Sequence, residues 1–182
     1  NELVKSRPDD PEREKKVHAF AEQFVARAFR RPLDDEDKAR FVDSHFKNAE
    51  TVDIGMRRLV LFTLTAPRFL YPDWQQKETP DQWDIAARLA LALWDSVPDH
   101  RLLMAAQKGQ TIHPNTVKSI TNWMVWDWRT KAKIRGFFHH WLELERSVDL
   151  SKDESAYPEF SDAVLADLKT SLFLSTDEAV WG

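Results

Sequence analysis

The stretch TPDQWDIAARLALALW, residues 79–94, decides the fold class of this chain. It opens with helix-start signals, because Thr79 offers a capping hydroxyl and Pro80 suits the first helical position, where an N–H would have no partner. Apolar side chains then recur at helical spacing, at Ile85, Leu89, Ala90, Leu93 and Trp94. The alanines between them allow a neighbouring helix to approach closely. The stretch therefore predicts a packed helix that begins near Pro80.

Helical spacing recurs on both sides of this stretch, with prolines and short polar runs at the boundaries. Residues 52–66 are apolar nearly all round, which predicts a buried helix that Pro67 ends. No β-alternation of useful length is present. The sequence therefore predicts an all-α fold of about eight helices. The other helices are expected over residues 9–28, 34–46, 98–109, 114–128, 130–146 and 158–181.

A polar, linker-like segment over residues 73–80 predicts a join between two packed helical subdomains. The expected N-terminal subdomain, residues 1–74, contains three helices and ends in an irregular aromatic link with Phe69, Tyr71 and Trp74. The expected C-terminal subdomain covers residues 79–182. The chain begins without Met and ends on an apolar pair, so we expect both ends to continue in a longer polypeptide.

Composition excludes several classes of function. The charged residues, 26 basic and 30 acidic, are interspersed, which argues against nucleic-acid binding and against a basic membrane patch. The absence of cysteine excludes disulfides, cysteine-type zinc sites and covalent haem c within this chain. Only four glycines argue against a Gly-rich nucleotide loop. No apolar run approaches the roughly 20 residues that span a bilayer.

Signatures of catalysis and of metal binding are absent from the sequence. It contains no Gly-x-Ser-x-Gly elbow, no phosphate-binding loop, no His-Glu-x-x-His and no calcium loop. No pair of carboxylates stands out as an acid/base couple. We therefore assign no catalytic residue and no metal ligand, and a carboxylate-based hydrolase is the weakest functional hypothesis.

The most distinctive polar pair is His139-His140, inside the segment Phe-Phe-His-His-Trp-Leu. Successive helical residues point about 100° apart, so the two rings diverge from each other and flank the apolar stripe. Gly136, one turn before His140, leaves room for a bulky neighbour, since a mid-helix glycine costs about 1 kcal/mol relative to alanine. The functional hypothesis is an axial ligand or a hydrogen-bond donor to a cofactor held by a neighbouring domain. The alternative is a boundary pair hydrogen-bonded to backbone or to Glu143.

Two further clusters have both a functional and a structural interpretation. Trp123, Trp126 and Trp128 would stack on a sugar or on a ring cofactor, or else pack in the core. Because their spacing on a helix prevents all three from facing one way, at least one is expected in the core and one at the periphery. Arg30-Arg31 has the chemistry to bind an anion, but a helix C-terminus favours cations on its own, so we prefer the structural interpretation.

Several motifs together resemble two adjoining helical domains of large planctomycete-type proteins that carry cytochrome c modules. The resemblance spans roughly residues 17–181. It departs from the family pattern at Leu91-Ala92, where Tyr-Phe is common, and at His139-His140, where a small residue and Gln are common. The matching segments are Ala28-Phe29-Arg30-Arg31-Pro32-Leu33, Ala66-Pro67-Arg68-Phe69-Leu70-Tyr71, Ala86-Ala87-Arg88-Leu89, Leu93-Trp94-Asp95-Ser96-Val97-Pro98-Asp99, the segment 137–144 and Tyr157-Pro158-Glu159-Phe160.

The resemblance implies a context and transfers no catalytic residue. Such proteins are exported, to the periplasm or beyond, and carry haem c outside these two domains. We therefore expect a helical scaffold fragment of a haem-c-linked protein, with cytochrome c modules and other domains of the same parent as partners. Its parent would work in electron transfer or as an oxidoreductase. The alternative is a helical module that binds polysaccharide or protein and has no redox role.

Overall fold

The computed structural model describes residues 6–7, 9–71, 79–143, 152–153 and 155–182. Every regular element in these ranges is helical. With residues 35–47 counted as one, the described part contains 9 helices, of which 8 have at least seven residues. The prediction of an all-α fold with about eight helices is confirmed.

The chain divides into two compact units, Asn1–Asn122 and Trp123–Gly182. The predicted join near residues 73–80 falls mostly outside the described residues, as does Trp74 of the predicted aromatic link. The predicted subdomains, residues 1–74 and 79–182, therefore stay a prediction.

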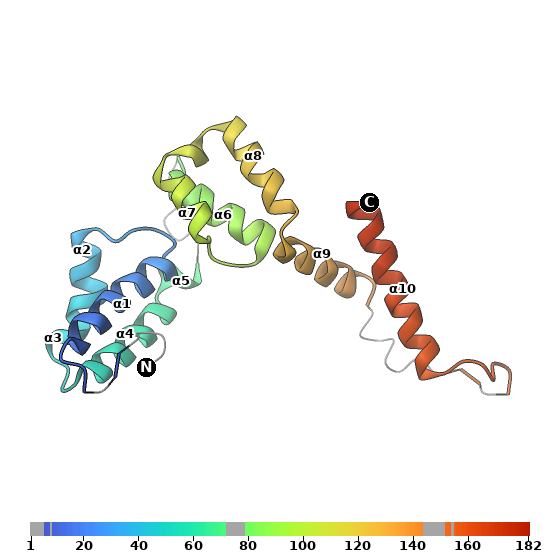
Figure 1. The fold of residues 1–182 in the computed structure, drawn as a ribbon, viewed down its shortest axis with the longest axis horizontal. Coiled ribbons are helices and arrows are strands. Elements are labelled where there is room, and N and C mark those ends of the chain that lie inside the picture. Colours follow the sequence, from blue (N-terminus) through green and yellow to red (C-terminus); the bar gives the residue numbers. More distant parts are fainter. Residues whose placement is uncertain (1–5, 8, 72–78, 144–151, 154) are drawn as a thin grey trace. The chain divides into compact units, whose positions relative to one another are not determined.

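In the first unit, α1 (Arg13–Ala28) lies beside α4 (Val52–Thr65), as Figure 1 shows. The apolar stripe of α1 follows helical spacing, which brings Val17, Ala21 and Val25 to the buried face. The helix begins four residues later than the predicted start at Asp9. The core around it consists of Ala21, Val25, Ala28, Phe29, Phe41, Val42, Leu59 and Ala66.

The predicted second helix is present, with an irregular centre. Asp34 caps it by accepting a hydrogen bond from the Asp37 amide. The helix runs through α2 (Asp35–Lys38), a π-helical turn η1 (Ala39–Asp43) and α3 (Ser44–Lys47). The π turn buries Phe41 and Val42 against the core.

The prediction that residues 52–66 form a fully buried helix is wrong. Only one stripe of α4, at Gly55, Leu59 and Thr63, is buried. The opposite face is open, and Leu61 is 67% exposed. That face therefore carries more apolar side chains than the neighbouring helices cover.

Pro67 ends α4 as predicted and also begins a short helix, α5 (Pro67–Leu70). Proline suits this first position because it has no N–H to leave unpaired. The irregular link predicted from Phe69 onward is therefore helical through Leu70. Tyr71 follows in extended backbone.

Helix α6 (Gln82–Trp94) forms where the sequence predicted it, with a different cap. Asp81 is the N-cap residue, so the predictions that Thr79 caps the helix and that Pro80 is its first residue are wrong. The Asp81 side chain accepts from the amides of Trp83 and Asp84, and the Asp84 side chain accepts from the Asp81 amide. This reciprocal capping box satisfies more backbone donors than a hydroxyl does.

The alanine-rich face of α6 is buried and packs against α7 (His100–Gln107) and the 3-10 turn η2 (Gln110–Ile112). Asp99 caps α7, and Gly109 takes the left-handed conformation (φ 67°) that glycine tolerates best after a helix. The buried Thr111 hydroxyl donates to the Gln82 carbonyl over 2.8 Å, which ties η2 to the start of α6.

After α8 (Pro114–Val125) the second unit contains α9 (Trp128–Trp141) and α10 (Asp162–Trp181), which are in contact. Arg135 joins the two helices through an ion pair with Asp177. The predicted extension of α9 to Arg146 falls partly outside the described residues, and within them the helix ends at Trp141. None of the described helices has the length and hydropathy that a membrane crossing requires.

Candidate functional site

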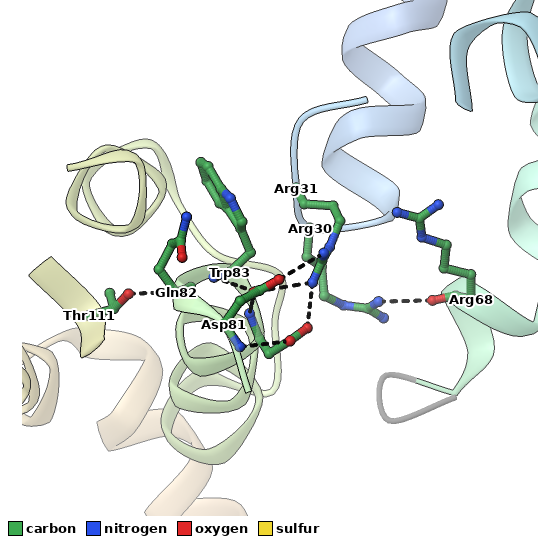
Figure 2. A network of polar contacts seen from close by, with 8 residues as sticks. Arg30, Arg31, Arg68, Asp81, Gln82, Trp83 and Thr111 are labelled. Carbon is green, nitrogen blue, oxygen red and sulfur yellow. Dashed lines mark hydrogen bonds and ion pairs between the residues drawn. The ribbon is translucent and has the colours of Figure 1, made fainter. Parts of the chain in front are cut away.

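The candidate site begins where α1 ends, at two consecutive arginines that point to different elements. Arg30 has a left-handed backbone (φ 62°), which is uncommon for a residue with a side chain. The amide of Arg30 donates to the Arg27 carbonyl over 3.2 Å, and that of Arg31 donates to Ala26 over 3.1 Å. This tight ending satisfies the last carbonyls of α1 and sends the two side chains apart. Figure 2 shows the resulting network.

Arg30 is a buried cation that holds the end of α5. Its side chain donates to the carbonyl of Phe69 over 2.7 Å and to that of Arg68 over 3.3 Å. The guanidinium carbon also lies 5.8 Å from the centre of the Phe69 ring. Burial lowers the pKa of Arg30, but an arginine pKa starts so high that the group stays charged. The cation therefore compensates carbonyls that the short helix α5 leaves without partners.

Arg31 reaches to the start of α6 instead. Its Nη1 lies 3.1 Å from Asp81 Oδ2, and its Nη2 lies 3.3 Å from Asp81 Oδ1 and 2.5 Å from Asp84 Oδ1. Both carboxylates belong to the capping box of α6, so the arginine binds residues that already fix the helix start. A forked guanidinium matches a carboxylate with two parallel hydrogen bonds, which makes this pairing directional.

Arg68 extends the network toward α2. Its guanidinium donates to Asp37 over 2.8 Å and lies 4.9 Å from the centre of the Phe29 ring. Arg30, Arg31 and Arg68 thus connect the end of α1, α2, α5 and the start of α6. We call Arg30, Arg31, Arg68, Asp37, Asp81 and Asp84 the arginine junction.

The arginine junction is suited to holding elements together. Its carboxylates already accept hydrogen bonds from arginine or from backbone amides, so these contacts explain them as structural groups. Nor do three or more His, Asp or Glu side chains gather in a metal-binding arrangement anywhere in the described residues. The sequence suggested an anion as one possible partner of Arg30-Arg31. For Arg31, that partner is the protein's own pair of carboxylates, Asp81 and Asp84.

The predicted histidine pair lies in the last turn of α9. The rings of His139 and His140 are 5.7 Å apart and nearly perpendicular, so they do not converge on one point. His139 is half-buried and stacks on Phe173 of α10 at 6.4 Å, whereas His140 is exposed. The two rings therefore do not converge on one ligand, and the prediction that His139 or His140 meets a haem stays a prediction. The space that a Cβ on Gly136 would occupy is open, with no atom within 4 Å.

The three predicted tryptophans do not share a helix. Trp123 is half-buried on α8, Trp126 lies between the helices, and Trp128 is the first residue of α9. The break occurs at Asp127, which caps α9 with its side chain, so the expectation of one continuous helix to Trp128 is wrong. Trp126 is 60% and Trp128 73% exposed, which leaves two indoles at the surface.

Sequence reasoning missed the partners of the arginine junction. The signal for the capping box, Asp-x-x-Asp at residues 81–84, was present, but its pairing with an arginine 50 residues earlier was not visible. The burial of Arg30 has a weaker signal, an arginine directly after an apolar helix end. Neither feature follows from local periodicity.

The arginine junction joins two segments of the chain that match different protein families. No curated protein and no solved structure matches the chain. Residues 16–72, which include the three arginines, match PSD5, described as a protein of unknown function (DUF1595). Residues 81–182, which begin at Asp81, match PSD4, also described as a protein of unknown function (DUF1592). The second match covers more than half of the chain, which therefore belongs to the PSD4 (DUF1592) family, with an adjoining PSD5 (DUF1595) domain before it.

Proposed function

We propose that this chain is a helical scaffold of an exported protein linked to haem c, and that it positions cytochrome c modules of its parent. The parent would then be an electron-transfer protein or an oxidoreductase of the periplasm or the exterior. The resemblance of its motifs to proteins with cytochrome c modules supports this context. Haem c itself would be bound by the other modules, since this chain has no cysteine.

One observation carries the scaffold part of the proposal, the pairing of Arg31 with Asp81 and Asp84. It joins the segment that matches PSD5 to the first helix of the segment that matches PSD4. A scaffold has to keep its parts in one arrangement. An ion pair that is only 19–30% exposed and directional on both sides limits the freedom of such a join.

The chain contains no native cysteine, so a spin label attached to an introduced cysteine reports on that position alone. We would label Lys47→Cys and Lys118→Cys, both exposed in the first unit, and measure their distance distribution by pulsed electron resonance. Arg31→Ala is expected to broaden the distribution. Arg57→Ala, an exposed arginine on α4, is the control that leaves it narrow. Equal distributions for Arg31→Ala and wild type would contradict the scaffold proposal.

The haem context has a separate test. An absorption spectrum of the native full-length parent, oxidised and reduced, with pyridine haemochrome quantitation, is expected to report haem c. His139→Ala or His140→Ala is expected to shift the haem bands, according to which ring meets a haem, whereas His113→Ala leaves them unchanged, and bands unchanged in both variants would remove the two histidines from the haem environment. A parent without haem would refute the redox context and leave the scaffold proposal standing.

The exposure of Trp126 and Trp128 favours a second candidate, a polysaccharide-binding module. Indole faces at the surface offer flat apolar area for sugar rings, although Lys131 lies 6.0 Å from the Trp126 ring and covers part of it. Titration of soluble polysaccharides against tryptophan fluorescence should then shift the emission. Trp126→Ala and Trp128→Ala would remove that shift, and an unchanged wild-type spectrum would count against this candidate.

A further inference from the structure

A cavity of about 400 Å³ lies between the last turns of α1 and the start of α6 and α7. It adjoins the arginine junction, because Arg31 and Trp83 belong to its wall. The scaffold proposal gives this cavity no role. Its lining consists of Gln23, Ala26, Arg27, Arg31, Pro32, Trp83, Pro98, His100, Leu103, Met104 and Gln107.

The wall of the cavity is largely apolar. Pro32, Pro98, Leu103 and Met104 supply aliphatic surface, and the half-buried Trp83 adds a flat ring. Figure 2 shows the Trp83 indole directed away from the carboxylate of Asp81. Small-molecule sites in proteins have volumes of about 300–1,000 Å³ and mostly apolar walls with a few polar groups, so the cavity has the size and the character of such a site.

The charged groups of the wall carry one sign. Its titratable side chains are Arg27, Arg31 and His100, and the described lining contains no carboxylate. Arg31 is already paired with Asp81 and Asp84. Arg27 is exposed, and no carboxylate of the described residues pairs with it. One guanidinium beside an apolar pocket therefore remains available for an anion.

We propose that this cavity binds a small amphipathic monocarboxylate, with its ring or hydrocarbon part against Trp83 and Met104 and its carboxylate on Arg27. A cationic ligand would meet only like or neutral charge in the wall. A polyphosphate would need several free cations, and the wall offers one free guanidinium beside a histidine. The binding step is an association without covalent chemistry.

The probe is 2-naphthoate, titrated calorimetrically into the full-length chain. We expect saturable binding, at least tenfold tighter than that of the neutral analogue 2-naphthylmethanol, because only the acid pairs with Arg27. Arg27→Gln should weaken the binding of naphthoate about tenfold and leave that of the alcohol unchanged. The matched control is Arg57→Gln, which changes an exposed arginine of α4 that is absent from the wall.

A second variant tests whether the positive charge of the cavity wall selects the ligand. Met104 is 37% exposed, so Met104→Glu can keep the fold while it adds a carboxylate to the wall, and circular dichroism checks this. This variant should lose naphthoate binding and gain affinity for 2-naphthylmethylamine. The proposal is overturned if naphthoate fails to bind at about 1 mM. Equal binding of acid and alcohol, or equal loss in the Arg27 and Arg57 variants, overturns it as well.

Discussion

At the scale of single residues, the backbone of Arg30 explains how adjacent arginines serve different helices. A left-handed residue turns the chain sharply, so Arg30 points to the end of α5 while Arg31 points to the start of α6. The left-handed conformation costs a residue with a Cβ roughly 1–2 kcal/mol. The buried hydrogen bonds of the Arg30 side chain offset that cost.

Two substitutions of Arg30 distinguish what its side chain and its backbone conformation contribute to stability. Arg30→Ala removes two hydrogen bonds and keeps the strain, so we expect the free energy of unfolding to fall by about 2 kcal/mol. Arg30→Gly also loses the side chain but relieves the left-handed strain, so it should be about 1 kcal/mol more stable than the alanine variant. Urea unfolding measures both, and an alanine variant as stable as the glycine variant would refute the argument.

His45 gives the protein a pH dependence of its own. Burial lowers its pKa, the positive charge of Arg58 adds to this, and its Nε2 has no hydrogen-bond partner among the residues that the structure describes. An unfolded histidine titrates near pH 6.5, so below that pH the unfolded chain binds more protons at this site than the folded chain does. The contribution to stability is therefore complete above about pH 6.5 and decreases as the pH falls.

Substitution of His45 by phenylalanine removes this titration and keeps a ring beside Phe62, whose centre lies 4.8 Å away. We expect the difference in unfolding free energy between pH 7.5 and pH 5.5, set about one unit on either side of the histidine pKa, to shrink in His45→Phe. The control is His113→Phe, at an exposed position. A pH dependence that stays at the wild-type size in the His45 variant would contradict the assignment.

At the scale of elements, two helical glycines differ in whether the packing leaves room for a side chain. A Cβ on Gly55 of α4 would lie 2.6 Å from Phe46 Cδ1 and 3.2 Å from the His45 carbonyl oxygen, so the glycine permits α3 to approach α4. A Cβ on Gly136 of α9 would meet no atom within 4 Å. Only the first glycine is required by the packing of this chain.

Alanine at each glycine therefore has a different expected effect. Gly136→Ala gains helix propensity of about 1 kcal/mol without a clash, so hydrogen exchange of the α9 amides should slow about fivefold. Gly55→Ala gains the same propensity but overpacks Phe46, so the first unit should lose about 1 kcal/mol. Hydrogen exchange and urea unfolding measure the pair, and a stabilised Gly55 variant would contradict the close contact.

Local sequence signals predicted the helices well and their surroundings less well. The helix starts near residues 34 and 98 could be predicted, because Asp34 and Asp99 have side chains that accept amide hydrogen bonds, which is local chemistry. The face of α4 with Leu61 was predicted to be buried, because composition does not reveal how much of a face neighbouring helices cover. The prediction that Thr79 caps α6 missed the local capping box of Asp81 and Asp84, whereas the pairing of that box with Arg31 lies in tertiary structure. Helical periodicity could not predict the arginine junction either, because its hydrogen bonds join residues that are far apart in the sequence.

At the scale of the whole molecule, the two units differ in how much they bury. The first unit contains the packed core around α1 and α4. In the second unit, the buried residues among those described are few, namely Met124, Thr130 and Thr176. Phe137, Trp141 and Leu174 stay more than half exposed on α9 and α10. Unequal burial implies unequal local stability.

Native-state hydrogen exchange should reveal this difference. Amides of α1 and α4 are expected to be protected far more strongly than those of α10 in the chain by itself. The proposed scaffold role adds an expectation: domains of a longer parent that cover the apolar faces of α9 and α10 would raise the protection of α10 toward that of α1. Equal protection of α1 and α10 in the isolated chain would contradict the difference in burial.

The π turn at Ala39–Asp43 also bears on insertions and deletions. A π turn holds one residue more than the α-helical winding takes, so loss of one residue there would leave an unbroken α-helix. Because the wider turn takes up the extra residue, removal of that residue would leave the later side chains at nearly the same angle about the helix axis. Phe46 would then still face Gly55, and the close contact between α3 and α4 would be kept. The π turn therefore lets this helix hold one residue more without changing the face of α3 that meets α4.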